Sequence, residues 1–374
     1  MRFAIQRGWT VIGIAVLLFG LAGAQPASAD DSPPTGGQIT ILISSAFARS
    51  APDEASERLF SVFAGETYSV LERAAGDRYV RISNGGPLTG WLPVSFGIWN
   101  PDGPVSAAAL AAARAERARQ VPRVPAGVIA SLSPQALAVY QRGLLRGNNP
   151  DVFAKIGDCN SENGRFLVMF ADPRLYRLGA RYAYLRATIA HYGESWERTS
   201  LAAQSGFGPA SVMDPVFADP SVCHSDESPL QCEYRLIRPS VALIALGTHY
   251  APTMAQYEAD LRLVIEESMR LGVVPILSTK ADDVEGQDRI NPIIRKLAAE
   301  YKMPLLDYWL AVQKLPNGGL NVDGIHPSYA RPIFDDPWSM QQGWPWRNLT
   351  ALLALDSVRA ATSSRLGRPG AGFR

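Results

Sequence analysis

Three short and almost continuously apolar runs in the second half of the chain constrain its fold more than any other feature. They are residues 241–247 (VALIALG), 273–280 (VVPILSTK) and 304–309 (PLLDYW). A strand with one face in water alternates apolar and polar residues, whereas a parallel strand buried on both faces is apolar throughout. We therefore interpret the three runs as parallel strands of a sheet that is covered on both sides.

Two further strand candidates and two helical patterns extend this interpretation. The strand candidates are residues 152–157 (VFAKIG) and 199–204 (TSLAAQ), and the helical patterns cover residues 253–272 and 289–302. Strands that alternate with helices predict an open parallel sheet with helices on both faces. We expect a five-stranded parallel sheet in a three-layer α/β/α domain over residues 151–361.

The residues before and after this domain do not show the alternation of strands and helices. Residues 38–100 contain short strand patterns about ten residues apart with turns between them, which is typical of a small all-β barrel. A linker follows at residues 101–150, with helix-forming stretches at residues 105–120 and 133–147. The polar and Gly-rich tail at residues 362–374 is expected to be disordered.

The N-terminus has the pattern of a secretory signal peptide. Arg2 and Arg7 precede an apolar stretch at residues 9–24, and Ala27-Ser28-Ala29 forms a small-x-small cleavage site. The alternative is an uncleaved membrane anchor, but a spanning helix needs about 20 apolar residues and this run is shorter. We expect cleavage after residue 29 and a protein located in the periplasm or outside the cell, with no membrane span after cleavage.

Export makes disulfides possible, and the chain has three cysteines. Cys223 and Cys232 lie nine residues apart in one polar loop and form the natural pair, although two unpaired surface cysteines are the alternative. An odd count leaves one thiol over. We expect that thiol to be Cys159.

Composition excludes some classes of partner. The formal net charge is +1, so the overall charge indicates neither a nucleic acid nor an anionic membrane surface as a partner. The potential metal ligands form no tight cluster in the sequence, and nothing indicates an organic cofactor.

Two strand ends carry residue types that can perform chemistry together. The first expected strand of the sheet ends at Gly157-Asp158-Cys159, and Asp323 and His326 follow the last one. The carboxyl ends of parallel strands meet at one edge of the sheet, where ligands bind. A carboxylate three residues before a histidine can hold the imidazole in one tautomer. The alternative is a turn-capping Asp followed by an ordinary surface His.

Residues 48–73 and 77–97 resemble a bacterial SH3-like domain. The second stretch carries Tyr79-Val80-Arg81 and the closing Thr89-Gly90-Trp91-Leu92. The resemblance implies a small β-barrel that binds a cell-wall peptide or glycan. A spacer barrel without a ligand is the alternative.

The C-terminal part, about 220 residues, resembles the SGNH or GDSL hydrolases. Gly157-Asp158-Cys159 matches their Gly-Asp-Ser block, and Asp323-Gly324-Ile325-His326-Pro327 matches their Asp-x-x-His-Pro block. The resemblance implies a flavodoxin-like α/β/α sandwich and acyl transfer through a nucleophile, a histidine and an aspartate. Cys159 would be the nucleophile, His326 the general base and Asp323 the residue that orients it.

The same resemblance implies an oxyanion hole and a pocket. The hole would be formed by the main chain at Cys159, the N–H of Gly208 (with Gly206 as an alternative) and the side chain of His249. The residues expected to line the pocket are Asp158, Asn160, Thr248, Lys280 and Asp282. Ser161 is a weaker alternative nucleophile.

The chain departs from the family pattern at two positions. Cys159 replaces the serine nucleophile, and His249 replaces the asparagine of the third block. A thiolate beside a histidine is a strong nucleophile, and a neutral imidazole can donate one N–H to an oxyanion. Losing an oxyanion donor altogether costs roughly 3–4 kcal/mol in a serine enzyme.

These features support two hypotheses of function. The first is an exported esterase or acyl hydrolase that uses Cys159, His326 and Asp323 on an acylated small molecule, carbohydrate or cell-envelope polymer; a transferase would use the same acyl-enzyme step. The second is an inactive SGNH-like protein that binds an envelope glycan or peptide.

Overall fold

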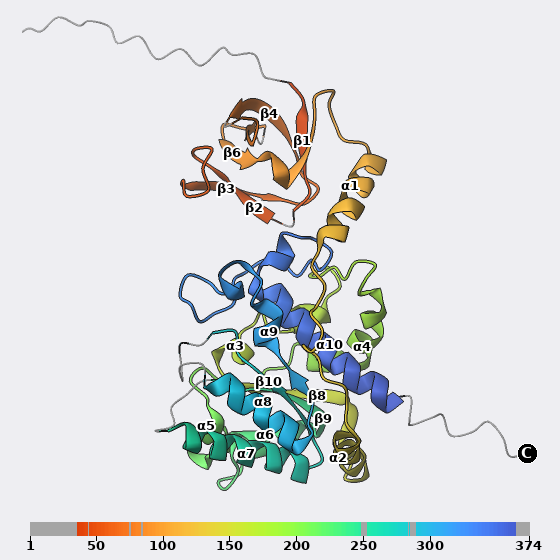
Figure 1. The fold of residues 1–374 in the computed structure, drawn as a ribbon, viewed down its shortest axis with the longest axis vertical. Helices are drawn as coiled ribbons and strands as arrows, with labels where there is room; N and C mark the ends of the chain where they lie inside the picture. Colours follow the sequence, from red (N-terminus) through yellow and green to blue (C-terminus); the bar gives the residue numbers. More distant parts are fainter. Residues whose placement is uncertain are drawn as a thin grey trace, which may run out of the picture.

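The computed structural model describes residues 36–363 apart from 44, 75, 84, 248–252, 283 and 285–288. The expected signal peptide and residues 364–374 of the expected tail lie outside the described residues. Figure 1 shows a small β-barrel above a larger α/β domain, with α1 running beside the contact between them. No helix in the described part is long and apolar enough to cross a membrane.

The barrel is a seven-stranded antiparallel sheet with the strand order β3-β2-β6-β5-β4-β1-β7. Its strands are β1 (Gln38–Ile41), β2 (Ser45–Arg49), β3 (Arg58–Phe63), β4 (Thr67–Ala74), β5 (Tyr79–Ser83), β6 (Thr89–Pro93) and β7 (Gly97–Asn100). In β5, Val80 and Ile82 are buried, whereas the residues between and beside them are half-buried. This alternation places one apolar face in the barrel core.

Two helices form at the expected places in the linker. The helix α1 (Ala107–Gln120) begins after Ser106, whose Oγ accepts a hydrogen bond from the N–H of Ala109 at 3.1 Å. The helix α2 (Pro134–Leu145) begins in the same way after Ser133, with proline as its first residue. Both starts follow the usual capping rules, because a serine oxygen satisfies an N–H group that has no partner inside the helix.

The α/β domain is built on a parallel sheet of the order β11-β10-β9-β8. Its strands are β8 (Asn149–Gly157), β9 (Pro239–Ala245), β10 (Val274–Ser278) and β11 (Leu305–Leu306). Each strand pairs with its neighbours in parallel register.

The described sheet has four strands where the sequence pattern predicts five, and one of the four is shorter than expected. Residues 199–204 form only one parallel bridge, between Ala203 and Gly157. The strand expected at 304–309 ends at Leu306, because the Asp307 side chain accepts from the N–H of Leu310 at 3.1 Å and starts a helix there.

The helices of the α/β domain cover both faces of the sheet. They are α3 (Cys159–Glu162), α4 (Arg186–His191), α5 (Pro209–Met213), α6 (Pro229–Ile237), α7 (Met254–Arg270), α8 (Ile290–Tyr301), α9 (Tyr308–Val312) and α10 (Gly343–Ser363). Short 3-10 turns are η1 (Val94–Phe96), η2 (Val168–Ala171), η3 (Ala183–Leu185), η4 (Gly193–Ser195), η5 (Pro215–Phe217), η6 (Pro316–Gly319) and η7 (Ser339–Gln341). Because α10 continues to Ser363, the first two residues of the expected tail are helical.

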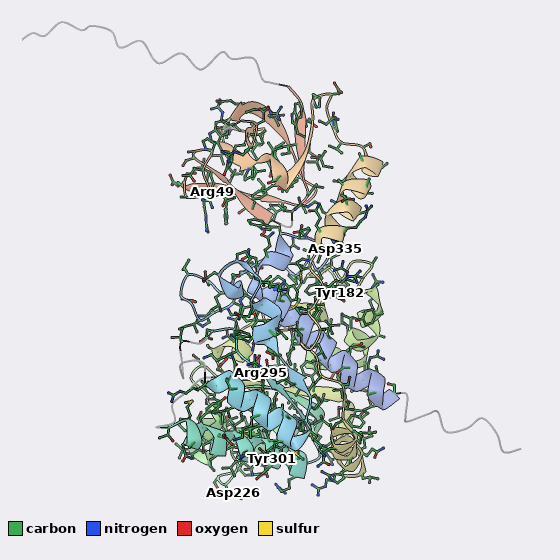
Figure 2. The ribbon with its side chains drawn as sticks, in the orientation of Figure 1. Arg49, Tyr182, Asp226, Arg295, Tyr301 and Asp335 are labelled. Carbon is green, nitrogen blue, oxygen red and sulfur yellow. A yellow bond between two sulfur atoms is a disulfide. The ribbon has the colours of Figure 1, made fainter. Side chains whose placement is uncertain are left out.

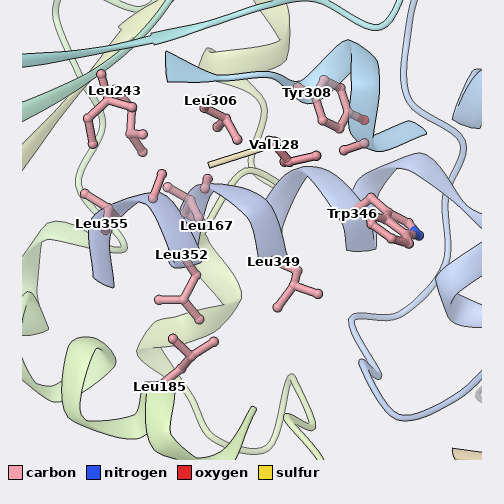
Figure 3. Packing of buried hydrophobic residues seen from close by; sticks show 14 of the residues in the cluster. Val128, Leu167, Leu185, Leu243, Leu306, Tyr308, Trp346, Leu349, Leu352 and Leu355 are labelled. Atoms are coloured by element: carbon pink, nitrogen blue, oxygen red, sulfur yellow. The ribbon is translucent and has the colours of Figure 1, made fainter. Parts of the chain in front are cut away.

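Neighbouring residues of the central strands enter opposite cores. In β9, Leu243 belongs to the core that also contains α2, α4 and α10, whereas Ile244 belongs to the core formed with α5 to α8. Figure 3 shows Leu349, Leu352 and Leu355 of α10 packed in the first of these cores. Burial on both faces explains why these strands are apolar throughout.

The cysteines pair as the sequence predicts. Cys223 and Cys232 form a disulfide with their Cα atoms 5.4 Å apart, and it ties the preceding loop to the first turn of α6. Cys159 lies outside this disulfide.

Candidate active site

Cys159 is presented by a tight connection between β8 and α3. The strand ends at Gly157, and Asp158 caps α3 by accepting from the N–H of Asn160 at 3.0 Å. A Cβ atom at Gly157 would lie 2.2 Å from Ser161 Oγ and 2.7 Å from the carbonyl oxygen of Ala245. The glycine therefore permits the close turn that places Cys159 at the carboxyl end of the sheet.

The loop after α9 holds the aspartate and the histidine together. Asp323 Oδ1 accepts hydrogen bonds from the main-chain N–H groups of Ile325 and His326, each at 2.9 Å. Gly324 between them has a φ of +70°, a conformation that glycine adopts without strain. The loop is closed by a hydrogen bond from the N–H of Asn321 to the carbonyl oxygen of His326 at 2.8 Å.

The structure brings Cys159, His326 and Asp323 into one chain of contacts. Cys159 Sγ lies 3.4 Å from His326 Nε2, and His326 Nδ1 lies 3.0 Å from Asp323 Oδ2. An Nδ1–H that donates to the carboxylate leaves Nε2 as the ring nitrogen that can accept a proton from the thiol. The arrangement has the form of a nucleophile, a base and an orienting acid.

Local hydrogen bonds keep the carboxylate of this group ionised. The main-chain N–H groups of Ile325 and His326, and then the His326 side chain, lower the pKa of Asp323 to about 2. Hydrogen bonds to the charged form of a carboxyl group favour that form. Asp323 is therefore a charged partner for the imidazole over the whole neutral range.

A cavity of about 230 Å³ opens beside Cys159 and His326. Its walls include four of the residues expected to line a pocket, namely Asp158, Asn160, Lys280 and Asp282. Lys280 Nζ lies 3.0 Å from Asp282 Oδ1 and donates to the carbonyl oxygen of Gly247 at 3.1 Å. The fifth expected pocket residue, Thr248, lies outside the described residues, as does His249, which was expected in the oxyanion hole.

The two glycine candidates for the oxyanion hole are placed differently. The N–H of Gly208 donates to Ser211 Oγ at 2.9 Å, at the start of α5, and Gly208 does not line the cavity. Gly206 does line it, beside Ser205. The main chain at Gly206, the alternative from the sequence, is therefore better placed to face a ligand than that of Gly208.

Arg347, a buried cation from α10, also lines the cavity, and the sequence interpretation missed it. Only 6% of Arg347 is exposed, and its guanidinium carbon lies 4.6 Å from the Phe166 ring centroid. Its Nη2 donates to Ser161 Oγ at 3.3 Å, and its Nε has no hydrogen-bond partner among the described residues. A charged residue inside the apolar sequence 343–355 was the available signal.

Burial and nearby charges act on Arg347 in opposite directions. Burial lowers the pKa of Arg347, while Tyr308, Asp158 and Cys159 favour its charged form. An arginine normally keeps its proton in proteins, so the cavity has a positive charge in its wall close to Cys159. The Ser161 hydroxyl is buried against this arginine, which leaves Cys159 as the nucleophile candidate that faces the cavity.

No curated protein sequence matches this chain. Solved structures similar to it include TesA (17% identity, 55% of this chain and 97% of that chain, TM-score 0.35). Others are a GDSL-like lipase from Bacteroides thetaiotaomicron (13%, 60% and 98%, 0.34) and a mutant acetyl-xylooligosaccharide esterase from Geobacillus (16%, 54% and 93%, 0.32). Residues 44–97 match the model of the bacterial SH3 domain, so the chain contains a bacterial SH3 domain followed by a parallel-sheet α/β domain.

Proposed function

We propose that this protein is an exported hydrolase that cleaves ester-linked acyl groups through Cys159, His326 and Asp323. The observation that carries the proposal is the chain of contacts from Cys159 Sγ to His326 Nε2 (3.4 Å) and from His326 Nδ1 to Asp323 Oδ2 (3.0 Å). The match of both sequence blocks to the SGNH pattern supports it. Export follows from the signal-peptide pattern at residues 1–29.

In the first half of the reaction the enzyme takes up the acyl group. His326 Nε2 removes the thiol proton, and Cys159 Sγ attacks the ester carbonyl carbon. The C–O bond to the alcohol then breaks, and the imidazolium returns the proton to the departing oxygen. The products of this half are the free alcohol and a thioester on Cys159.

In the second half water removes the acyl group. His326 takes a proton from a water molecule, whose oxygen attacks the thioester carbon, and the C–S bond breaks to regenerate the thiol and release a carboxylic acid. Asp323 holds the imidazole and stabilises its cationic form in both halves. The main-chain N–H groups at Cys159 and Gly206 are the donors we assign to the oxyanion.

The size of the cavity favours a short acyl group. Pockets for drug-sized ligands measure about 300–1,000 Å³, whereas this cavity measures about 230 Å³. It also carries the polar groups of Lys280, Asp282 and Asn160 in its walls. We therefore propose acetyl or similarly small esters of a carbohydrate or cell-envelope polymer as substrates.

The proposal is tested with p-nitrophenyl esters of increasing acyl length. The wild-type protein should hydrolyse acetate faster than longer esters, Cys159→Ala should show no turnover, and Cys159→Ser should keep measurable turnover because His326 can also activate a hydroxyl group. Wild-type protein that fails to turn over any ester, yet binds a glycan, would make it a binding protein instead.

A further inference from the structure

Two neighbouring cavities lie along the boundary between the barrel and the α/β domain. One measures about 650 Å³ and lies between β2 and β3 of the barrel and residues 321–342 of the α/β domain. The other measures about 600 Å³ and lies between Ala64 of the barrel and residues 173–186 and 331–335 of the α/β domain. Arg331 lines both cavities. We refer to the two cavities together as the interdomain groove.

Positive charge is concentrated in the interdomain groove. Six arginines line it: Arg49, Arg58, Arg174, Arg177, Arg186 and Arg331. Among the residues that the structure describes, only two carboxylates line it with them, those of Glu54 and Asp335. Figure 2 labels Arg49 and Asp335 near the boundary of the two domains. Because the whole chain has a net charge of only +1, this excess is a local feature.

Several of these arginines are available to an anionic ligand. Arg177 is occupied by Asp335, at 2.6 Å, and Arg174 by Asp172. No ion pair within the described ranges involves Arg58, Arg186 or Arg331. Unpaired guanidinium groups in a concave site bind carboxylates through two parallel hydrogen bonds.

Exposed aromatic side chains lie among the arginines. Phe47 is 41% exposed, Phe63 is 42% exposed and Tyr329 is 58% exposed, and all three line the groove. The Arg58 guanidinium lies 4.7 Å from the centroid of the Phe47 ring. Large exposed aromatic surfaces in a hollow indicate a binding site, and flat rings suit the apolar faces of sugar rings.

One loop connects the groove to the cavity beside Cys159 and His326. Residues 325–327 line that cavity, and residues 328–331 line the groove. The two sites therefore lie at the two ends of a short segment that also carries His326. A long polymer in the groove would pass close to Cys159, whereas a small molecule would not need the groove.

We propose that the interdomain groove binds a polysaccharide whose sugars carry carboxylate groups, a polyuronate. The arginines pair with the carboxylates, and the aromatic rings stack on the sugar faces between them. The same polymer would carry the acyl groups removed at Cys159, and this part rests on the function proposed above. Binding of the polymer in the groove does not depend on that function.

The test is a binding measurement with the full chain carrying Cys159→Ala, so that no turnover can affect the result. Polygalacturonate is the probe, dextran is the neutral control and polyphosphate is the anionic control without sugar. We expect polygalacturonate to bind with an affinity that falls as salt rises, and dextran not to bind. No binding of polygalacturonate, or equal binding of dextran, would overturn the proposal.

Matched variants locate the site. Arg58→Gln with Arg331→Gln should weaken polygalacturonate binding at least about tenfold, since two charge-assisted contacts to the carboxylates are lost. The control is Arg119→Gln with Arg270→Gln, which removes the same charge from exposed sites on α1 and α7. Tyr329→Ala should weaken binding of polygalacturonate more than that of polyphosphate. Equal affinities of the two double variants would place binding elsewhere and refute the assignment.

Discussion

At the scale of single residues, Asp323 has two structural tasks. Its Oδ1 closes the turn through the N–H groups of Ile325 and His326, and its Oδ2 contacts the imidazole. The pKa of Asp323 is lowered to about 2, so its contribution to stability is complete above its unfolded value of about 3.9 and is lost as the pH falls through about 2. Loss of activity at mildly acidic pH therefore has to come from another group.

The variant Asp323→Asn separates these two tasks. An asparagine oxygen can still accept both main-chain hydrogen bonds, but the charge that steadies the imidazolium is gone. We expect the melting temperature to stay close to that of the wild type and ester turnover to fall by roughly 10²–10⁴-fold. Thermal unfolding and kcat on p-nitrophenyl acetate are the measurements, and unchanged turnover would remove Asp323 from the mechanism.

Arg347 is the second residue whose surroundings suggest a role in the reaction. Asp158 and Cys159 favour its charged form, and such an interaction is mutual: a nearby guanidinium favours the thiolate of Cys159. Because Arg347 is buried and contacts the rings of Phe166 and Tyr308, its position is held by packing.

The expected effect is a shift in thiol reactivity. In Arg347→Met, the pH at which alkylation of Cys159 by iodoacetamide reaches half its maximal rate should rise, because a neighbouring positive charge is lost. Arg347→Lys should keep part of the effect. Circular dichroism checks that both variants are folded, and identical pH profiles for all three proteins would show that Arg347 only fills space.

At the scale of elements, the connection between β8 and α3 decides where the thiol lies. The connection packs so closely that Gly157 contacts α3 on one side and β9 on the other. The N–H of Gly157 also donates to the carbonyl oxygen of Ala202 at 3.0 Å, which joins the segment 199–204 to the sheet edge. The position of Gly157 is therefore fixed by α3, by β9 and by the segment 199–204 together.

Gly157→Ala tests this coupling. The added methyl group would meet Ser161 Oγ and the Ala245 carbonyl oxygen below 3.0 Å, so we expect a loss of about 1–3 kcal/mol in the free energy of unfolding. Gly164→Ala is the matched control, because nothing lies within 4 Å of its new Cβ. Urea denaturation measures both; equal midpoints for the two variants would contradict the close packing described.

At the scale of the whole molecule, a few contacts join the barrel to the α/β domain. The ring centroids of Phe96 and Trp338 lie 4.9 Å apart. Arg117 of α1 donates to the carbonyl oxygen of Ser95 at 2.9 Å and lies 3.6 Å from Asp336 Oδ1. Since the Asp336 side chain is almost completely buried, this ion pair is better protected from solvent than a surface pair.

Trp338→Ala should loosen the attachment of the barrel. Removing the ring takes away the aromatic contact with Phe96, and we expect calorimetry to show two separate unfolding transitions where the wild type shows one. Phe217→Ala, which removes an exposed ring outside the interdomain groove, is the control and should keep a single transition. A single transition in both variants would mean that the contacts of Arg117 and the rest of the interface are enough to keep the two domains unfolding together.

The local patterns of the sequence determined the elements and the class of the fold. The apolar runs at 241–247 and 273–280 predicted buried parallel strands, the helix-forming composition of 105–120 predicted α1, and Ser133 followed by Pro134 predicted the start of α2. These features depend only on burial and on residues close in the sequence. The same patterns placed Cys159 at the end of the first strand of the sheet and Asp323 and His326 in the segment that follows the last one. Their catalytic roles stay a proposal.

Only the tertiary structure decided which distant segments meet. It placed Arg347 of α10 beside Cys159, brought Gly206 and not Gly208 to the cavity, and formed the groove between the two domains. It also shortened the strand expected at 304–309, where the side chain of Asp307 starts a helix. Contacts between residues far apart in the chain arise from the packing of whole elements. The local sequence pattern around a residue therefore does not predict which distant residues it contacts.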